Sequence, residues 1–74
     1  MTDNQWRIEL LATIRGTDWD IDWCAAAQLH PHYLADIRNR ATREARRIEV
    51  SVESFRTLES RRAEIMRQVL LASD

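Results

Sequence analysis

The residues WCAAAQLHPHYLADIRNR (Trp23–Arg40) predict two short helices joined by a tight turn. Three consecutive alanines, residues 25–27, favour a helix because alanine loses no side-chain entropy there. Pro31 suits the first turn of a second helix, where its missing N–H would have no partner anyway. From Leu34 onward apolar residues follow at steps of three or four, so the second helix is expected to continue to about Arg47. The pattern is that of a helix-turn-helix.

One further helix is expected before this unit. Apolar residues recur at helical spacing within residues 5–15, and Gly16 is expected to end the helix because glycine accepts positive φ. The acidic stretch Thr17–Asp22 then offers caps for the next helix. A short strand is the alternative here, because apolar and acidic residues alternate from Trp19 to Trp23.

The C-terminal third predicts a long helix over about residues 52–72, with an apolar stripe that includes Leu70. Before it, Ile48–Val52 alternates apolar and polar residues, which fits either a short strand or a joint between helices capped by Ser51. The chain is therefore expected to be a single all-α domain over residues 1–74. Within it, the helix-turn-helix reading unit would cover about residues 20–47, and the last helix would pack on it or form a dimer.

Length and composition restrict the class of protein. A 74-residue chain has room for one domain, and its small core makes a second subunit an expected source of further burial. The single cysteine, Cys24, excludes an internal disulfide, and together with His30 and His32 it lacks a fourth metal ligand. The chain has no signal-peptide pattern and no apolar run of membrane length, so a cytoplasmic protein without membrane contact is expected.

Catalytic patterns are missing from the sequence. It contains no glycine-rich phosphate loop, no nucleophile beside an obvious base and no pair of carboxylates at a useful spacing. We therefore expect a protein that is not an enzyme and that binds no cofactor.

Charge is unevenly distributed although the net charge is only −1. Residues 1–28 carry five acids and two arginines, whereas residues 29–47 carry five arginines and two acids. A local basic segment of this kind is typical of a nucleic-acid-binding face. An ordinary solvated helix face, with Arg40 and Glu44 paired at i,i+4, is the alternative.

The segment LHPHYLADI, residues 29–37, resembles the Cro/lambda-repressor-like helix-turn-helix regulators. Cys24 takes the place of the small residue in the first helix, Gln28 that of the turn and Leu29 that of the apolar pin. Two departures stand out: the family usually has glycine where Gln28 stands, and it has more helices than fit after Arg47. The likeness extends loosely from Trp6 to Arg47 and rests on His30, Tyr33, Leu34, Asp36 and Ile37.

The resemblance implies that the second helix enters the major groove of double-stranded DNA. Base reading would centre on His32, Asp36 and Arg40, and the remaining arginines would contact phosphates. The expected function is a small, dimeric, sequence-specific transcriptional regulator of the phage or mobile-element type. Its expected DNA-binding residues are His32, Tyr33, Asp36, Arg38, Arg40, Arg43, Arg46 and Arg47.

A second hypothesis is a small helical adaptor or inhibitor that binds another protein, such as a host protein, and no DNA. Trp19, flanked by Asp18 and Asp20, is the expected exposed anchor, although a shared core is the alternative for the three tryptophans. If Asp18, Asp20, Asp22 and Asp36 shared the face of the arginines, this hypothesis would be favoured over DNA binding. The expected dimer or partner interface comprises Trp19, Phe55, Leu58, Ile65, Met66 and Val69.

Overall fold

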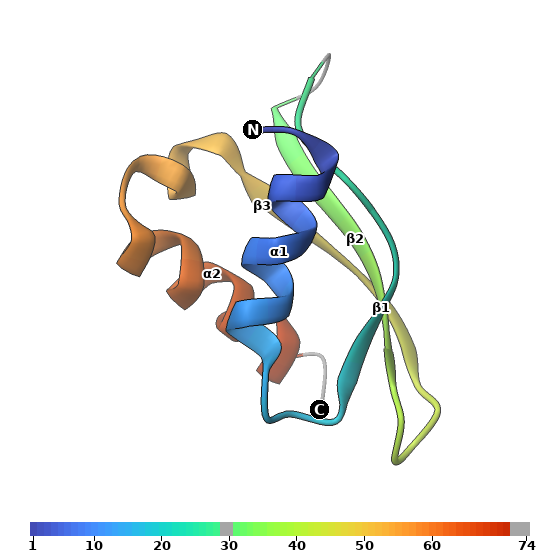
Figure 1. The fold of residues 1–74 in the computed structure, drawn as a ribbon. Coiled ribbons are helices and arrows are strands. Elements are labelled where there is room, and N and C mark those ends of the chain that lie inside the picture. Colours follow the sequence, from blue (N-terminus) through green and yellow to red (C-terminus); the bar gives the residue numbers. More distant parts are fainter. Residues whose placement is uncertain (29–30, 72–74) are drawn as a thin grey trace.

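The computed structural model describes residues 1–28 and 31–71, and these residues form an α+β fold (Figure 1). A three-stranded antiparallel sheet lies between two α-helices in the chain order, so the expectation of an all-α domain is wrong. The elements are α1 (Asp3–Ile14), β1 (Trp19–Ala25), β2 (His32–Asn39), β3 (Ala45–Ser51), the 3-10 helix η1 (Val52–Arg56) and α2 (Leu58–Leu71).

Helix α1 confirms the helix predicted over residues 5–15. The Gln5 N–H donates to Thr2 Oγ1 at 3.1 Å and the Thr2 N–H donates to Gln5 Oε1 at 2.8 Å, which forms a capping box. The helix stops before Gly16, whose φ of +86° is costly for a residue with a side chain. Its buried side chains are Trp6, Leu10 and Ile14.

The sheet occupies the segment that was expected to form the helix-turn-helix. In β2, Tyr33, Ala35 and Ile37 are buried and the residues between them are more exposed, which is the period of two of a strand. Leu34 and Ile37 also have helical spacing, so this stretch satisfies both periods, and pairing with β1 and β3 selects the strand. The helices expected over Trp23–Gln28 and Pro31–Arg47 are therefore wrong.

The two strand alternatives are the correct ones. Residues 19–23 lie in β1, and the stretch from Ile48 lies in β3 as far as Ser51. The alanines at 25–27 carry high helix propensity, yet Ala25 ends β1 and Ala26 is buried in the core. The predicted turn pin Leu29 lies outside the described residues, and so does His30.

A tight turn breaks the basic segment between β2 and β3. Asn39 Oδ1 accepts hydrogen bonds from the N–H groups of Ala41 and Thr42, at 2.8 and 3.0 Å. The N–H of Arg43, whose φ is +64°, donates to the Asn39 carbonyl oxygen at 2.7 Å. Asparagine favours such turns because its side chain can satisfy backbone donors two and three residues later. The five arginines are therefore divided over two strands and a turn.

The helix predicted over residues 52–72 is two helices. Ser51 is the expected cap, and its Oγ accepts from the Glu53 N–H at 3.1 Å to start η1. Thr57 then has an extended backbone, and its Oγ1 accepts from the Ser60 N–H at 3.0 Å at the start of α2.

Both helices cover one face of the sheet and leave the other face open (Figure 1). At the centre of the covered side, the Trp6 Nε1–H donates to the Leu34 carbonyl oxygen at 2.9 Å. Tyr33 stacks on Phe55 with ring centroids 3.9 Å apart, and Trp6 contacts both rings. Ile65 of α2 adds to the same core.

Side chains from the helices bond to the backbone at one position of β3 and directly after the end of β1. The Gln68 side chain accepts from the Glu49 N–H at 2.8 Å and donates to the Glu49 carbonyl oxygen, as a neighbouring strand would. Asp3 Oδ1 of α1 accepts from the N–H of Ala26, which directly follows β1, at 2.8 Å. The face of the sheet opposite the helices is left uncovered by either of them.

Candidate interaction surface on the open face of the sheet

A β-bulge in β1 turns Trp23 to the open face. Ile21 pairs with Ile37 and Trp23 pairs with Asp36, so Asp22 is the inserted residue between two neighbouring pairs. Simple alternation from Trp19 would have directed Trp23 into the core. The inserted residue instead places the Trp23 side chain on the opposite face. Trp23 is 45% exposed.

Trp19 lies in the core. The adaptor hypothesis expected it to be an exposed partner anchor, but it is 6% exposed, as the shared-core alternative for the tryptophans predicted. Two residues away, Ile21 is packed against the same core. The acidic neighbours Asp18 and Asp20 are exposed, so the alternation seen in the sequence is that of a strand with one buried face.

Three ion pairs lie on the open face, each between a β1 or β2 carboxylate and an arginine. They join Arg38 Nε to Asp22 Oδ2 at 3.1 Å and Arg40 Nε to Asp20 Oδ2 at 3.4 Å. The third is bidentate, with Arg47 Nε and Nη2 at 2.8 and 3.1 Å from the two oxygens of Asp36. Such half-exposed pairs contribute little stability individually. Their effect is to balance the charge of the face.

Trp23, Asp36 and Arg47 form a cluster across the middle of the sheet. These residues stand opposite one another on the three strands. The Arg47 guanidinium lies over the Trp23 ring, 5.5 Å from its centroid, in a cation–π contact. Its hydrogen bonds hold the pKa of the Asp36 carboxyl below its ordinary value. The guanidinium is therefore fixed from two sides, which orients the indole on the surface.

The predicted DNA-binding residues lie on β2, the turn and β3, and no helix presents them. Tyr33 is 7% exposed and part of the core, so it is not on the surface. Arg46 projects from the side of β3 that carries Ile48, and its Nη2 pairs with Glu44 Oε2 at 2.6 Å. The structure brings together on the open face His32, Asp36, Arg38 and Arg47, with Arg40 and Arg43 where β2 leads into the turn.

The expected dimer or partner interface is largely internal. Ile65 and Val69 are 0% and 1% exposed and form the contact of α2 with the sheet layer. Phe55 is half-buried in the aromatic cluster, and Met66 is also half-buried. Leu58, at 44% exposure, is the member of that set whose side chain is most open to solvent.

Sequence reasoning missed Trp23 as a surface residue. It named Asp20 and Asp22 as acids that could share the face of the arginines, but not the arginine with which each pairs. The alternation from residue 19 to 23 indicated the strand, but nothing in it marks the inserted residue. A bulge depends on the pairing with β2, which a local pattern does not contain.

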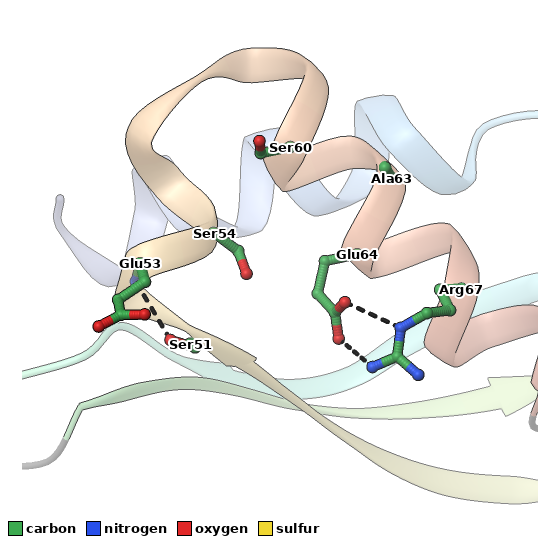
Figure 2. Close-up of a pocket in the computed structure, with 7 residues that line it drawn as sticks. All are labelled: Ser51, Glu53, Ser54, Ser60, Ala63, Glu64 and Arg67. Atoms are coloured by element: carbon green, nitrogen blue, oxygen red, sulfur yellow. Dashed lines mark hydrogen bonds and ion pairs between the residues drawn. The ribbon is translucent and has the colours of Figure 1, made fainter.

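A hollow lies between η1 and α2, with a volume of about 640 Å³ (Figure 2). Glu64 on one wall is paired with Arg67 of the next helical turn, which lowers the pKa of the Glu64 carboxyl. The hollow contains serine hydroxyls but no histidine, lysine or cysteine that could activate one of them as a nucleophile. Its lining residues are Ser51, Glu53, Ser54, Ser60, Ala63, Glu64 and Arg67.

Neither a metal site nor an activated thiol is found among residues 1–28 and 31–71. No group of three or more histidine, cysteine or acidic side chains within residues 1–28 and 31–71 could hold a metal ion. Burial raises the pKa of the Cys24 thiol, which keeps it in the less reactive protonated form.

Comparisons with known proteins do not assign the chain to a family. No protein-family model matches it, and neither a curated protein nor a solved structure matches it significantly. None of the helices within the described ranges has the length and apolar character needed to cross a membrane.

Proposed function

We propose that this protein is a small binding module that recognises another protein through the open face of its sheet. The observation that carries the proposal is Trp23, which the bulge holds 45% exposed beside the Arg47 guanidinium. Tryptophan and arginine are the residues most enriched among those that dominate binding energy at protein interfaces. A fixed pair of this kind at the centre of a face offers a partner a large contact at a low entropic cost.

The charge of the face supports a protein partner over duplex DNA. Arg38, Arg40 and Arg47 are each paired with an aspartate, and Glu49 adds a fourth carboxylate to the same side of the sheet. Nonspecific DNA affinity comes from unneutralised cations that displace counterions from phosphates. This is the arrangement that the sequence hypothesis named as favouring an adaptor, although DNA binding itself stays an untested prediction.

The size of the face sets the expected strength of binding. Neighbouring strands lie about 4.8 Å apart and rise about 3.3 Å per residue. The area of three strands is therefore small compared with the roughly 800 Å² that each partner buries in a standard interface. We therefore expect the partner to be a short segment or a small domain. The expected dissociation constant is in the micromolar range, which corresponds to a binding free energy of about 8 kcal/mol.

A differential capture experiment tests the proposal. The immobilised wild-type chain and the variants Trp23→Ala and Arg47→Ala are exposed to an extract of the source cells, with Leu58→Ala as the matched control. Leu58 is 44% exposed and lies on the helical side. We expect proteins that the wild type and the control retain and that both face variants lose. Purified partner should bind Trp23→Ala at least about tenfold more weakly, as for an interface hot spot.

The same samples are titrated with duplex DNA at low salt. DNA binding with a steep salt dependence, unchanged in Trp23→Ala, would contradict the proposal and support the regulator hypothesis. Retention of the same proteins by all variants would also contradict it, because the contact would then lie elsewhere.

A further inference from the structure

Where β2 leads into the turn, the open face ends in a hollow lined mainly by charged side chains. The hollow has a volume of about 350 Å³, and the turn beside it projects away from both helices (Figure 1). Its lining residues are Asp20, Asp22, Arg38, Asn39, Arg40 and Arg43, and we call it the Arg43 hollow. Three guanidinium groups stand against two carboxylates, so the lining carries a net positive charge.

Arg43 supplies the charge that is not compensated. The other two arginines of the hollow are paired, Arg38 with Asp22 and Arg40 with Asp20. The exposed side chain of Arg43 makes no ion pair with any residue that the structure describes. A guanidinium presents five N–H donors in a planar fork, so those of Arg43 are open to a ligand.

The turn accounts for the backbone at Arg43 but not for its side chain. Its φ is +64°, a conformation that glycine and asparagine adopt at a lower cost than other residues. The hydrogen bond from its N–H to the Asn39 carbonyl oxygen could be made by any residue except proline. An arginine here therefore adds a cation to the hollow rather than stability to the turn.

An adjoining hollow connects the Arg43 hollow with the cluster around Trp23. It has a volume of about 320 Å³ and shares Asp22 and Arg38 with the Arg43 hollow. Its lining also includes Asp36 and Arg47, and the Arg47 guanidinium lies over the Trp23 ring. The exposed indole and the positive hollow are thus parts of one continuous surface along the sheet.

We propose that the open face binds an extended segment of its partner, with an apolar side chain on Trp23 and an aspartate or glutamate in the Arg43 hollow. This rests on the proposed function and names the chemistry of the partner. Trp23 lies opposite Asp36, and Arg40 is four residues beyond Asp36, which is about 13 Å along the strand. In an extended peptide, residues four apart point to the same side at this spacing. The expected motif is therefore an apolar residue and an acidic residue four positions apart.

A single carboxylate suits the Arg43 hollow better than a nucleic-acid backbone does. A carboxylate can accept two parallel hydrogen bonds from one guanidinium, and Arg43 is the guanidinium without a partner in this hollow. Asp20 and Asp22 repel further anions beside it. A duplex presents a row of phosphates and gains affinity from several uncompensated cations. One carboxylate and one free guanidinium balance each other.

Two blocked peptides test the proposal by NMR titration of the isotope-labelled full chain at low salt. The first is Ac-Leu-Thr-Ser-Thr-Glu-NH2, and the second has glutamine in place of glutamate; both are also made in reverse order. We expect the glutamate peptide to bind with a dissociation constant of about 1 mM in at least one order. It should bind about three- to tenfold more tightly than its glutamine counterpart and shift the Trp23 indole and Arg43 guanidinium signals together.

Three variants separate the two contacts. Arg43→Asn should fold as well as the wild type, because asparagine accepts positive φ, and it should bind both peptides equally. Arg62→Gln removes the same charge from an exposed position of α2 and should keep the preference for glutamate. Trp23→Ala should weaken both peptides, which is what the proposed function alone requires.

Equal binding of the two peptides to the wild type overturns the inference, and so does a preference for glutamate that persists in Arg43→Asn. In either case a loss of binding in Trp23→Ala leaves the proposed function standing. No binding of any peptide up to about 10 mM also overturns the inference. Tighter binding of inorganic phosphate or duplex DNA than of the glutamate peptide, lost in Arg43→Asn, overturns it in favour of a phosphate ligand.

Discussion

Trp6 and Trp23 show how one residue type serves two purposes in this small protein. Trp6 is 0% exposed and its indole N–H donates to the Leu34 carbonyl oxygen at 2.9 Å. Trp23 is half exposed, and the contact recorded for its ring is with Arg47 on the surface. Burial of a tryptophan with its N–H satisfied stabilises the core, whereas a half-exposed indole contributes little to folding.

Replacing Trp6 with phenylalanine should therefore destabilise the fold by about 2–4 kcal/mol. The variant loses ring volume in the core and the hydrogen bond from the indole N–H to the Leu34 carbonyl oxygen. Urea unfolding followed by circular dichroism measures the change in free energy of unfolding. Trp23→Phe, the control, should stay within about 0.5 kcal/mol of the wild type because the site is on the surface. Equal losses in both variants would contradict this difference.

The pair of Asp36 and Arg47 gives the fold a defined pH dependence. The Arg47 hydrogen bonds lower the pKa of Asp36 in the folded state, so this carboxyl stays ionised to a lower pH than in the unfolded chain. The stabilisation is present at neutral pH and is lost as the pH falls through the folded-state pKa.

In Arg47→Gln, we expect the Asp36 pKa to rise toward its ordinary value and the acid-side loss of stability at Asp36 to disappear. Carboxyl carbon shifts of Asp36, followed by NMR from neutral pH to about pH 2, measure the pKa directly. Arg43→Gln is the control, because Arg43 has no ion pair within the described parts of the chain. An Asp36 pKa that is the same in wild type and Arg47→Gln would contradict the assignment.

At the scale of elements, the sequence predicted the helices better than the sheet. The stop at Gly16 and the Ser51 cap are local signals, and each was found where the pattern indicated. The stretch from Tyr33 to Ile37 carries apolar residues that fit either period. Its partners on β1 and β3 are distant in sequence, so local spacing could not select between helix and strand.

The candidate site was predicted in part for the same reason. Arg38, Arg40 and Arg47 stood out as a basic run, but their pairing with Asp20, Asp22 and Asp36 depends on strand register. The basic segment and the acidic segment, separate in the sequence, become neighbours once β1 pairs with β2. The exposure of Trp23 depends on the bulge, which is likewise set by that pairing.

Deleting Asp22 tests the bulge. Because Asp22 is the inserted residue, its removal should leave Trp19 and Ile21 in the core and Trp23 outward, in a regular ladder. The variant should fold, and its Trp23 indole N–H should still exchange quickly with solvent by NMR. Deleting Asp36 from the regular strand β2 instead turns Tyr33 and Ala35 outward, which should unfold the protein. An unfolded Asp22 deletion would contradict the proposed register.

At the scale of the whole molecule, one ion pair connects the two helices above the aromatic cluster. Arg61 Nη1 lies 3.4 Å from Glu9 Oε1, and the Arg61 guanidinium carbon lies 5.1 Å from the centre of the Phe55 ring. Both side chains are mostly shielded, at 15% and 26% exposure, and Glu9 Oε2 and Arg61 Nε are buried without a hydrogen-bond partner. Losing one member of such a pair leaves the other charge in a poorly solvated place.

Arg61→Met should therefore destabilise the protein by about 1–3 kcal/mol, more than the double variant Glu9→Gln/Arg61→Met. The double variant removes both charges and keeps similar volumes, so it should recover most of the loss. Urea unfolding of the wild type, the two single variants and the double variant gives the coupling energy, and Arg62→Met on the exposed side of α2 is the control. If the changes in free energy of unfolding of the two single variants simply add up to that of the double variant, the ion pair contributes no coupling between the helices. Packing of Trp6, Ile65 and Val69 then holds the helices on the sheet.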